Sequence, residues 1–330
     1  MKRVAIIGGG AWGTALATVA RRSGAAVKLW ARDAAIVDAI NRRHENPVYL
    51  PQVPLDPAIV ATSDPVLATE GAEGVLLVVP AQHLRGVIDR FAAVLRAGLS
   101  ILICAKGIET RSLLTMSEVV TQSLPGRPLG ILSGPSFAAE VACDLPTAVT
   151  IACRDAALGQ SYLELLAAGR FRPYLSSDTT GVEIGGAIKN VLAIACGVVA
   201  GRGLGDNARA ALITRGLAEM TRFGVARGAR AETFAGLSGL GDLVLTCNAA
   251  QSRNYRLGLA LGRGESLGTA LRAAERSVVE GVATAAAVAE LAGRLGVEMP
   301  VCEAVDAVLH RAAAVSQAVD GLLSRPYRNE

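Results

Sequence analysis

The feature that most constrains the fold of this chain is a run of glycines directly after its first apolar segment. Val4-Ala5-Ile6-Ile7 leads straight into Gly8-Gly9-Gly10-Ala11-Trp12-Gly13, which has the spacing Gly-x-Gly-x-x-Gly. Between a strand and a helix, Gly8 makes a tight turn, Gly10 lets the backbone approach a pyrophosphate, and Gly13 allows close helix–strand packing. We therefore predict a strand, a turn and a helix whose N-terminus binds a dinucleotide.

The rest of the first half alternates short Val, Ile and Leu runs with helical patterns, whereas the second half reads as helical. Strands are predicted at 3–7, 26–30, 74–79, 99–104, 129–132 and 148–153, and helices at 12–23 and 33–43. Further helices are predicted at 181–200, 207–228, 253–261, 267–276, 283–295 and 301–311, with glycine-rich loops at 201–205 and 236–241.

Alternation of strands and helices implies right-handed crossovers and a parallel sheet that is covered on both faces. We predict an α/β Rossmann-type doubly wound dinucleotide-binding domain over 1–178, followed by an all-α substrate-binding and catalytic domain over 179–330. A ligand cleft between the two is the expectation for such an arrangement.

Composition narrows the class of protein further. The net charge is only +4, with no long basic run, so nucleic acid is not expected as a partner. The N-terminal apolar run is too short for a signal peptide, and no run of apolar residues approaches a membrane span, so we expect a cytoplasmic, soluble protein without membrane insertion. The three histidines show no metal-ligand spacing, so no metal site is expected. Six cysteines without a Cys-x-x-Cys pair predict free, buried thiols: Cys104, Cys143, Cys153, Cys196, Cys247 and Cys302.

The end of the second predicted strand bears on the choice of nicotinamide cofactor. An NAD site usually has an acidic residue there for the ribose 2′-OH, and this chain has Ala31. Arg32 follows and is able to pair with a 2′-phosphate, while Asp33 is placed to cap the next helix. The cofactor is therefore predicted to be NADP or NAD, with NADP favoured.

One lysine stands out in the helical half. Between Ile184 and Ala200, Lys189 is the only acidic or basic residue, and Gly185 and Ala193 lie on its face of the helix. Small residues there let another backbone or a ligand approach. A buried charge is costly, so this lysine needs an anionic partner, loses its proton or meets a substrate. A structural lysine paired with a distant carboxylate is the alternative.

Three more clusters are placed to reach the cleft. Lys106 follows a buried strand at the edge where α/β sheets bind ligands, although an ordinary exposed lysine is the alternative. Gly134 and Ser136, in Ser133-Gly134-Pro135-Ser136-Phe137-Ala138, contact substrate or nicotinamide, or merely form a turn and cap.

The third cluster lies in the helical half. Ser252 is a good N-cap, so Arg253 and Asn254 fall in a first helical turn that suits an oxyanion or phosphate. Asp242, on a glycine-hinged loop, either holds a substrate hydroxyl, orients Lys189 or is a simple loop carboxylate.

Taken together, the motifs of the chain resemble those of the soluble bacterial NAD(P)-dependent sn-glycerol-3-phosphate dehydrogenases. In order they are Gly-x-Gly-x-Trp-Gly-Thr-Ala, Ala-Lys-Gly-Ile-Glu, Ser-Gly-Pro-Ser-Phe-Ala, Gly-Gly-Ala-Ile-Lys-Asn-Val, Asn-Ala-Arg-Ala-Ala-Leu-Ile-Thr-Arg-Gly, Gly-Leu-Gly-Asp-Leu and Gln-Ser-Arg-Asn. The resemblance runs from Lys2 to about His310. It departs at Ala11, where the family often has serine, and at Ala283, where relatives often carry arginine.

The resemblance implies a role for each matching residue. Lys189 would be the proton donor and acceptor. Substrate would be bound by Lys106, Gly134, Ser136, Lys189, Asp242, Ser252, Arg253 and Asn254. The cofactor would be bound by Gly8, Gly10, Ala11, Trp12, Gly13, Arg32, Lys106, Ala138, Arg253, Val278 and Glu280.

The reaction implied is reversible hydride transfer between the nicotinamide and dihydroxyacetone phosphate, giving sn-glycerol 3-phosphate for glycerophospholipid synthesis. The expected partner is therefore this small-molecule substrate, and a homodimer is compatible with a helical second domain. Two alternatives are another β-hydroxyacid dehydrogenase, of the 6-phosphogluconate dehydrogenase or ketopantoate reductase kind, and a dinucleotide-sensing regulatory module. A regulatory module of this kind needs no proton donor, so the presence of Lys106 and Lys189 argues against it.

Overall fold

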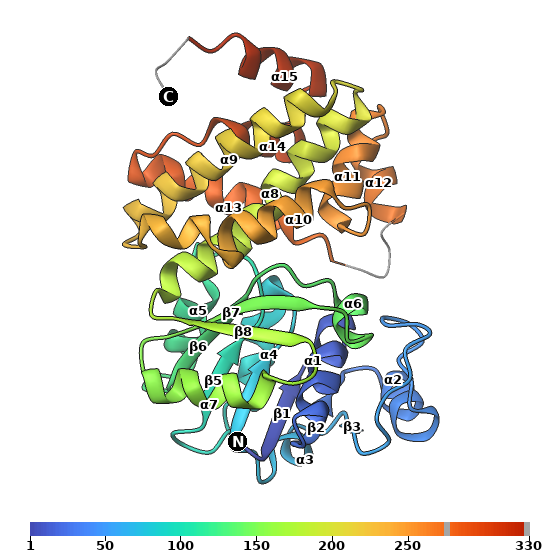
Figure 1. The fold of residues 1–330 in the computed structure, drawn as a ribbon. Coiled ribbons are helices and arrows are strands. Elements are labelled where there is room, and N and C mark those ends of the chain that lie inside the picture. The colour runs from blue at the N-terminus through green and yellow to red at the C-terminus, as the bar shows by residue number, and fades with distance from the viewer. Residues whose placement is uncertain (274–277, 327–330) are drawn as a thin grey trace. The chain divides into compact units, whose positions relative to one another are not determined.

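A computed structural model describes residues 1–273 and 278–326 of the chain. These residues form two compact units. The N-terminal unit comprises Met1–Lys106 and Leu114–Glu183, and the helical unit comprises Gly107–Leu113 and the described residues from Ile184 onward. The predicted architecture, a doubly wound α/β domain followed by an all-helical one, is confirmed (Figure 1).

The N-terminal unit is built on one sheet of eight strands in the order β3-β2-β1-β4-β5-β6-β7-β8. Its central strands are apolar on both faces, as buried parallel strands must be, and Ile7 of β1 lies level with Trp30 of β2 and Leu77 of β4. The strands are β1 (Arg3–Ile7), β2 (Ala26–Trp30), β3 (Val60–Thr62), β4 (Gly74–Leu77), β5 (Ser100–Ile103), β6 (Leu129–Ser133), β7 (Thr147–Cys153) and β8 (Phe171–Ser176).

Helices cover both faces of this sheet and form a separate apolar core on each. One core receives side chains from α1 (Ala11–Arg22), α2 (Ala34–Asp38), α6 (Ala138–Ala142) and α7 (Ala156–Leu166). The other receives them from α3 (Pro65–Thr69), α4 (Leu84–Phe91) and α5 (Met116–Ser123). The predicted helix at 33–43 is divided into α2 and a π-helical turn, Ala39–Arg43.

The sheet is not wholly parallel, and this corrects the prediction. β7 runs antiparallel to β6, and β8 is parallel to β7. The connection between these strands contains the five-residue helix α6, and β7 then runs back beside β6, with Ser133 level with Thr150 and Gly130 level with Cys153.

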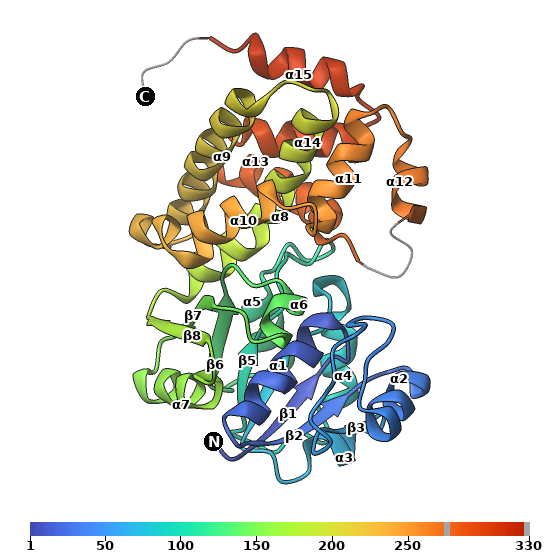
Figure 2. The same ribbon diagram turned by 45° about the vertical axis from the view of Figure 1, so that its right-hand side comes forward.

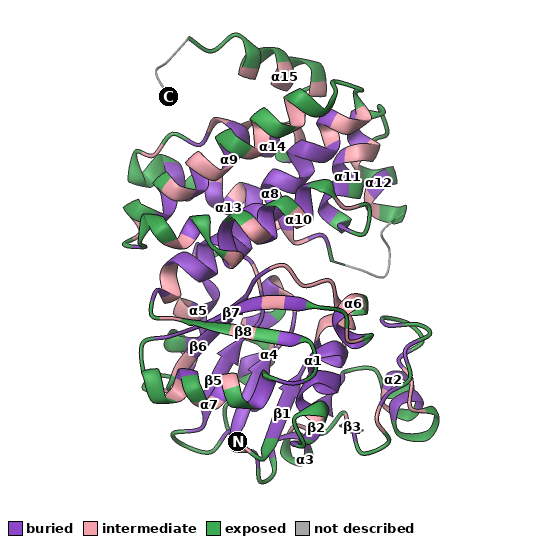
Figure 3. Ribbon diagram, viewed as in Figure 1, coloured by how far each residue is buried: buried purple, intermediate pink, exposed green. Residues whose placement is uncertain are grey.

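The helical unit is organised around α8 (Thr179–Gly201), whose residues from Ile184 onward are almost all buried (Figure 3). By length and composition this helix passes for a membrane span, with a mean hydropathy of 1.7, contrary to the expectation that no such segment exists. However, 83% of its most apolar 18-residue stretch is buried inside the protein, as in the core helix of a globular domain. The other helices are α9 (Asp206–Ala226), α10 (Asp242–Asn248), α11 (Arg253–Gly262), α12 (Leu267–Ala273), α13 (Glu280–Leu295), α14 (Pro300–His310) and α15 (Val315–Leu323) (Figure 2).

α8 and α11 approach each other so closely that their backbones touch. A Cβ atom at Gly197 or Gly201 of α8 would collide with backbone of α11, at Tyr255 and Leu259 respectively. Conversely, a Cβ at Gly258 or Gly262 of α11 would collide with backbone of α8. Two glycines four residues apart on each helix therefore form the crossing, and no side chain separates the two helices there.

Several elements differ from the predictions. The expected loop at 236–241 is a π-helical turn, Leu237–Gly241, and it leads into α10, so Asp242 begins a helix instead of lying on a loop. β3, β8, α3, α4, α5, α7 and α15 were not predicted. The predicted helix at 267–276 ends at Ala273 in α12, and its remaining positions lie outside the described residues. All six cysteines are free, and Cys143 is exposed where a buried thiol was expected.

Candidate active site

The turn between β1 and α1 has the shape that the three spaced glycines predict. Gly8 has a φ of +130°, in the region that favours glycine, and a Cβ there would lie 2.7 Å from the carbonyl oxygen of Val78. A Cβ at Gly13 would collide with the carbonyl group of Gly8, so helix and turn are in direct backbone contact. Nothing lies within 4 Å of a Cβ at Gly10, which leaves that position open.

The N-terminus of α1 fits a dinucleotide phosphate. Gly10 is the N-cap and no side chain caps the helix, so its first N–H groups face outward with the positive end of the helix dipole. Ala11 and Trp12 are the first helical residues and are half-buried. Among the described residues the buried Nε1 of Trp12 has no hydrogen-bond partner, which leaves a donor available beside this helix end.

At the end of β2, the arginine and the aspartate have separate positions. Asp33 is the N-cap of α2 and accepts a hydrogen bond of 2.9 Å from Ala35 N, so its carboxylate is already used. Arg32 is exposed. Ala31 packs against Gly9, whose Cβ position would lie 2.5 Å from the Cβ of Ala31. The acidic group of a typical NAD site is thus replaced by an alanine methyl group and a neighbouring guanidinium.

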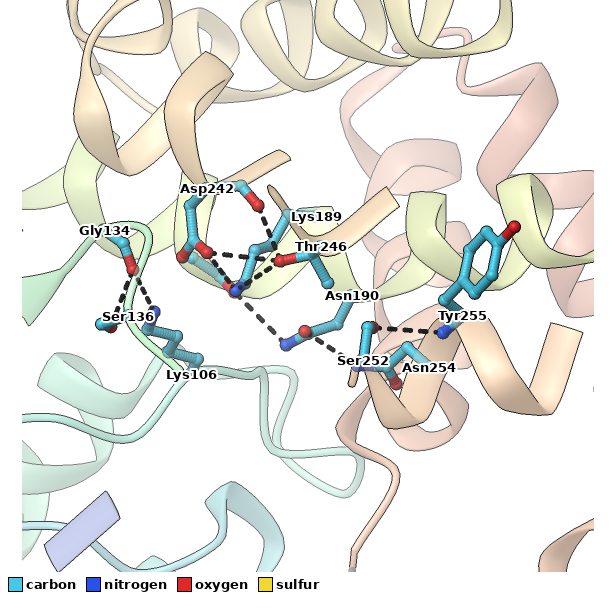
Figure 4. A network of polar contacts seen from close by, with 11 residues as sticks. Lys106, Gly134, Ser136, Lys189, Asn190, Asp242, Thr246, Ser252, Asn254 and Tyr255 are labelled. Atoms are coloured by element: carbon cyan, nitrogen blue, oxygen red, sulfur yellow. Dashed lines mark hydrogen bonds and ion pairs between the residues drawn. The ribbon is translucent and has the colours of Figure 1, made fainter. Parts of the chain in front are cut away.

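Lys106, Gly134 and Ser136 come together at the carboxyl ends of the neighbouring strands β5 and β6 (Figure 4). The Nζ of Lys106 and the hydroxyl of Ser136 each donate to the carbonyl oxygen of Gly134, both over 3.0 Å. Gly134 has a φ of +140°, and a Cβ there would lie 2.9 Å from Val149 Cα. Glycine is therefore required at this turn. Ala138, half-buried, begins α6 four residues later.

Lys189, in the helical unit, has a buried anionic partner. Its Nζ forms an ion pair with Asp242 Oδ1 and donates a hydrogen bond of 2.9 Å to the hydroxyl of Thr246 (Figure 4). Lys189 is 8% exposed and Asp242 is 1% exposed. Thr246 lies one helical turn after Asp242 on α10, and its hydroxyl also lies 2.6 Å from the carbonyl oxygen of Asp242. The three groups therefore form one buried polar cluster.

Another backbone segment packs closely against the helix beside Lys189. The predicted approach of another backbone is confirmed at Gly185, whose Cβ position would lie 2.5 Å from the carbonyl oxygen of Ser238. Cys247 is buried beside the cluster, and hydrogen bonding to Cys196, together with burial, raises the pKa of the Cys247 thiol well above its usual range. Cys247 is therefore a neutral thiol and adds no negative charge to that of Asp242.

Ser252, Arg253 and Asn254 occupy the start of α11 as predicted. The Ser252 hydroxyl accepts a 3.2 Å hydrogen bond from Tyr255 N and so caps the helix. Arg253 is exposed in the first turn. Asn254 is 8% exposed, and its amide joins two other segments: Nδ2 donates to Asn190 Oδ1 over 2.9 Å, and Oδ1 accepts from Gly281 N over 3.0 Å.

The two remaining predicted residues lie at the start of α13. Glu280 is its first residue, and Val278, two residues earlier, is 38% exposed. Gly281 follows, and a Cβ there would lie 2.6 Å from the carbonyl oxygen of Asn190 and 2.8 Å from Asn254 Oδ1. This end of α13 is therefore held directly against α8 and α11.

Two further residues, Asn190 and Thr246, belong to these polar contacts although the sequence motifs do not assign them a role. Asn190 follows Lys189 in the chain, and its amide links Gly186 of the same helix to Asn254. Thr246 would have been identified from its spacing of four residues from Asp242 if that segment had been predicted as a helix. Within residues 1–273 and 278–326, no group of three or more His, Cys, Asp or Glu side chains is arranged to hold a metal ion.

Comparison with known proteins agrees with these features over the whole chain. Residues 3–159 match the model of the NAD-dependent glycerol-3-phosphate dehydrogenase N-terminus, and residues 178–320 match that of the C-terminus. The chain is 57% identical over 327 residues to the glycerol-3-phosphate dehydrogenase [NAD(P)+] of Rhodospirillum rubrum, covering 99% of this chain and 93% of that protein. It is 55% identical over 329 residues to the enzyme of that name from Caulobacter vibrioides, covering 100% and 99%.

A solved structure gives the same result. The crystal structure of glycerol-3-phosphate dehydrogenase from Coxiella burnetii is similar, with a TM-score of 0.94 and 42% sequence identity over 98% of this chain and 99% of that one. These matches favour the predicted family over the 6-phosphogluconate dehydrogenase and ketopantoate reductase alternatives. The chain belongs to the NAD-dependent glycerol-3-phosphate dehydrogenase family.

Proposed function

We propose that this NAD(P)-dependent glycerol-3-phosphate dehydrogenase uses Lys189 as proton donor and acceptor in the interconversion of dihydroxyacetone phosphate and sn-glycerol 3-phosphate. The observation that carries the proposal is the buried cluster of Lys189, Asp242 and Thr246. Within it the ammonium is held by a carboxylate and a hydroxyl, and Lys189 is the only acidic or basic residue between Ile184 and Ala200 of α8. A positioned, compensated charge of this kind suits proton transfer to an oxygen that becomes negative.

When bound, the nicotinamide cofactor supplies hydride-transfer chemistry at C2 of the substrate. As negative charge develops on the C2 oxygen, the ammonium of Lys189 stabilises it and then gives up a proton to it. In the oxidative direction the neutral amine accepts the hydroxyl proton. Asp242 favours the ammonium form because it compensates the charge, and the hydroxyl of Thr246 fixes the direction of Nζ.

Substrate binding is proposed for two further groups of residues, one at the ends of β5 and β6 and one at the start of α11. Lys106, Gly134 and Ser136 would contact the substrate from the N-terminal unit. Arg253 would bind the phosphate with the help of the free N–H groups of α11. Ser252 and Asn254 already have protein partners, so each would contact the substrate with its remaining hydrogen-bonding capacity, namely the Ser252 hydroxyl proton and the second Asn254 N–H.

Cofactor binding is proposed at the β1–α1 turn, which fits a pyrophosphate, and at the other matching positions. These are Gly8, Gly10, Ala11, Trp12, Gly13, Arg32, Lys106, Ala138, Arg253, Val278 and Glu280. A preference for NADP is proposed from the exposed guanidinium of Arg32 and from Ala31 in place of an acid.

The test is an assay of NADPH and NADH oxidation with three substrates. Dihydroxyacetone phosphate is expected to be reduced well, whereas dihydroxyacetone and 2-keto acids are expected to react poorly, because the phosphate anchors the substrate. Equal rates with dihydroxyacetone or a 2-keto acid would contradict the proposed anchoring of the substrate by its phosphate, whereas the role of Lys189 is tested by its replacement.

The cellular role and the assembly are also proposals. The resemblance to bacterial sn-glycerol-3-phosphate dehydrogenases supports supply of the product to glycerophospholipid synthesis in the cytoplasm. A homodimer is proposed from the helical second domain. Light scattering on the purified chain would show a mass of twice 33.9 kDa if the dimer forms.

A further inference from the structure

A loop of the N-terminal unit reaches the dinucleotide turn through one buried side chain. The segment between the π-helical turn at Ala39–Arg43 and β3 carries Asn46, which is 0% exposed. Its Nδ2 donates to the carbonyl oxygen of Gly9 over 3.0 Å and to the hydroxyl of Thr14 over 2.8 Å. Both N–H bonds of one amide group therefore hold the turn and the first part of α1.

The loop is folded so that this amide is itself held in place. Asn46 Oδ1 accepts a 3.2 Å hydrogen bond from Tyr49 N, and the carbonyl oxygen of Asn46 accepts one of 2.9 Å from Leu50 N. The three side-chain hydrogen bonds fix the orientation of the amide group. Leu50, which is 3% exposed, anchors the same loop in the apolar core.

The contact with Gly9 determines which way the next N–H group points. A peptide unit is planar and trans, so its carbonyl oxygen and its N–H hydrogen lie on opposite sides. Because Asn46 holds the oxygen of Gly9, the N–H of Gly10 is directed away from Asn46. Gly9 is also closely packed, since a Cβ atom there would lie 2.5 Å from the Cβ of Ala31. The orientation of the Gly10 N–H is thus set before any ligand arrives.

We infer that Asn46 is a positioning residue for NAD(P): it holds the peptide between Gly9 and Gly10 so that the Gly10 N–H is preorganised for the pyrophosphate. The inference rests on the cofactor use of this family and is independent of the role of Lys189. Preorganisation of the turn lowers the cost of binding. Because the pyrophosphate is common to NADH and NADPH, Asn46 acts equally on both cofactors.

The experiment measures cofactor binding in the absence of substrate, by quenching of tryptophan fluorescence or by calorimetry. Asn46→Ala is expected to raise the Kd for NADH and for NADPH by the same factor, about tenfold or more, which corresponds to about 1.4 kcal/mol. At saturating cofactor, kcat should stay close to that of the wild type, so the loss appears in KM for the cofactor.

Two control variants separate this role from simple support of the loop. Leu50→Ala removes a buried side chain from the same loop and is expected to lower the free energy of unfolding while leaving both Kd values within about twofold of wild type. Thr14→Val removes the other acceptor of Asn46 and leaves the Gly9 contact in place, so it too should bind both cofactors normally.

Two outcomes would overturn the inference. One is a wild-type Kd in Asn46→Ala, and the other is an equal rise in Kd in Leu50→Ala. If Asn46→Ala does not fold, Asn46→Ser takes its place, since the shorter hydroxyl does not reach both acceptors. A wild-type Kd in that variant would equally contradict the role of Asn46.

Discussion

The hydroxyl of Thr246 lies 2.6 Å from the backbone carbonyl of Asp242, one helical turn before it, and accepts a hydrogen bond from Lys189 Nζ. If the hydroxyl proton is given to that carbonyl, a lone pair is left facing the ammonium. Asp242 and Thr246 together therefore specify both the charge and the direction of the amine. The helix that places them, α10, determines the geometry of the proposed proton transfer.

We expect Lys189→Ala to lower kcat by at least about 100-fold, the usual scale for a positioned acid–base group. Steady-state rates with dihydroxyacetone phosphate check this, and circular dichroism checks the fold, because the change leaves Asp242 without its lysine. Lys28→Ala, at a half-buried lysine of β2, is the matched control and should be fully active. Near-normal turnover in Lys189→Ala would leave this residue with only the structural role of an ion pair.

Thr246→Val, which keeps the shape of the side chain, should lower kcat roughly tenfold, since one hydrogen bond to a charged group contributes about 1.5–3 kcal/mol. KM for both substrates should change little because the substrate-binding residues are untouched. Thr246→Ser retains the hydroxyl and is expected to restore most of the rate. If the valine variant turns over as fast as wild type, the hydroxyl has no part in orienting Lys189.

Arg253→Ala is expected to raise KM for dihydroxyacetone phosphate by roughly 10- to 100-fold through loss of a charge-assisted contact with the phosphate. The measurement compares kcat/KM for dihydroxyacetone phosphate with kcat/KM for dihydroxyacetone. Because dihydroxyacetone has no phosphate, its kcat/KM should fall little in Arg253→Ala. Arg256→Ala, at an exposed arginine three residues later on α11, provides the control. An equal loss with both substrates would remove Arg253 from phosphate binding.

Arg32→Ala should raise the Kd for NADPH about tenfold and leave that for NADH nearly unchanged, because only NADPH carries the 2′-phosphate. Arg42→Ala removes an exposed arginine that pairs with Asp38 and should affect neither cofactor. Fluorescence titration gives the ratio of the two Kd values. This ratio distinguishes Arg32 from Asn46, whose replacement shifts both constants together.

Glu219 predicts a dependence of stability on pH. Burial raises the pKa of its carboxyl to about 7, although hydrogen bonds from Val301 N and Cys302 N oppose the shift. The folded state therefore binds more protons than the unfolded state between about pH 4.5 and 7. The stabilising contribution of protonated Glu219 is complete below that window and is lost as the pH rises through it.

Glu219→Gln should abolish the fall in the free energy of unfolding between about pH 4.5 and 7, which is on the order of 3 kcal/mol. Urea unfolding at pH 5 and pH 8 would show wild type losing stability relative to the variant at the higher pH. Glu290→Gln, at an exposed glutamate that pairs with Arg294, should follow the wild-type curve. Parallel curves for wild type and Glu219→Gln would show that Glu219 titrates normally.

Patterns that depend on neighbouring residues in the chain allowed good predictions from sequence. The strand, turn and helix around Gly8 and Gly13 were predictable because each glycine meets a local steric demand. The sequence predicted that a buried Lys189 needs an anionic partner, and Asp242 was one of the candidates for that partner. Its helical setting was not, because two glycines before it suggested a loop and tertiary packing made a π-helical turn of them.

Features that depend on contacts between distant segments of the chain could not be predicted from the sequence. The antiparallel pairing of β7 with β6 joins residues that are far from adjacent in the chain, and the sequence pattern between the two strands does not define its direction. Asn46 lies 37 residues from Gly9 in an irregular loop, where no periodicity indicates which way a side chain points. The link between Asn190 and Asn254 similarly spans 64 residues.

The glycine crossing of α8 and α11 has a consequence for the range of substrates. Lys189 lies on one of these helices and Arg253 on the other, and main-chain atoms in contact fix how near the two helices come. Substitution of other residues proposed to bind substrate would alter the chemical groups that the substrate meets, but it would leave the distance between α8 and α11 unchanged. A side chain at Gly197, Gly201, Gly258 or Gly262 would collide with the backbone of the facing helix and push α8 and α11 apart. The distance between Lys189 and Arg253 is therefore expected to be most sensitive to substitution at these four positions.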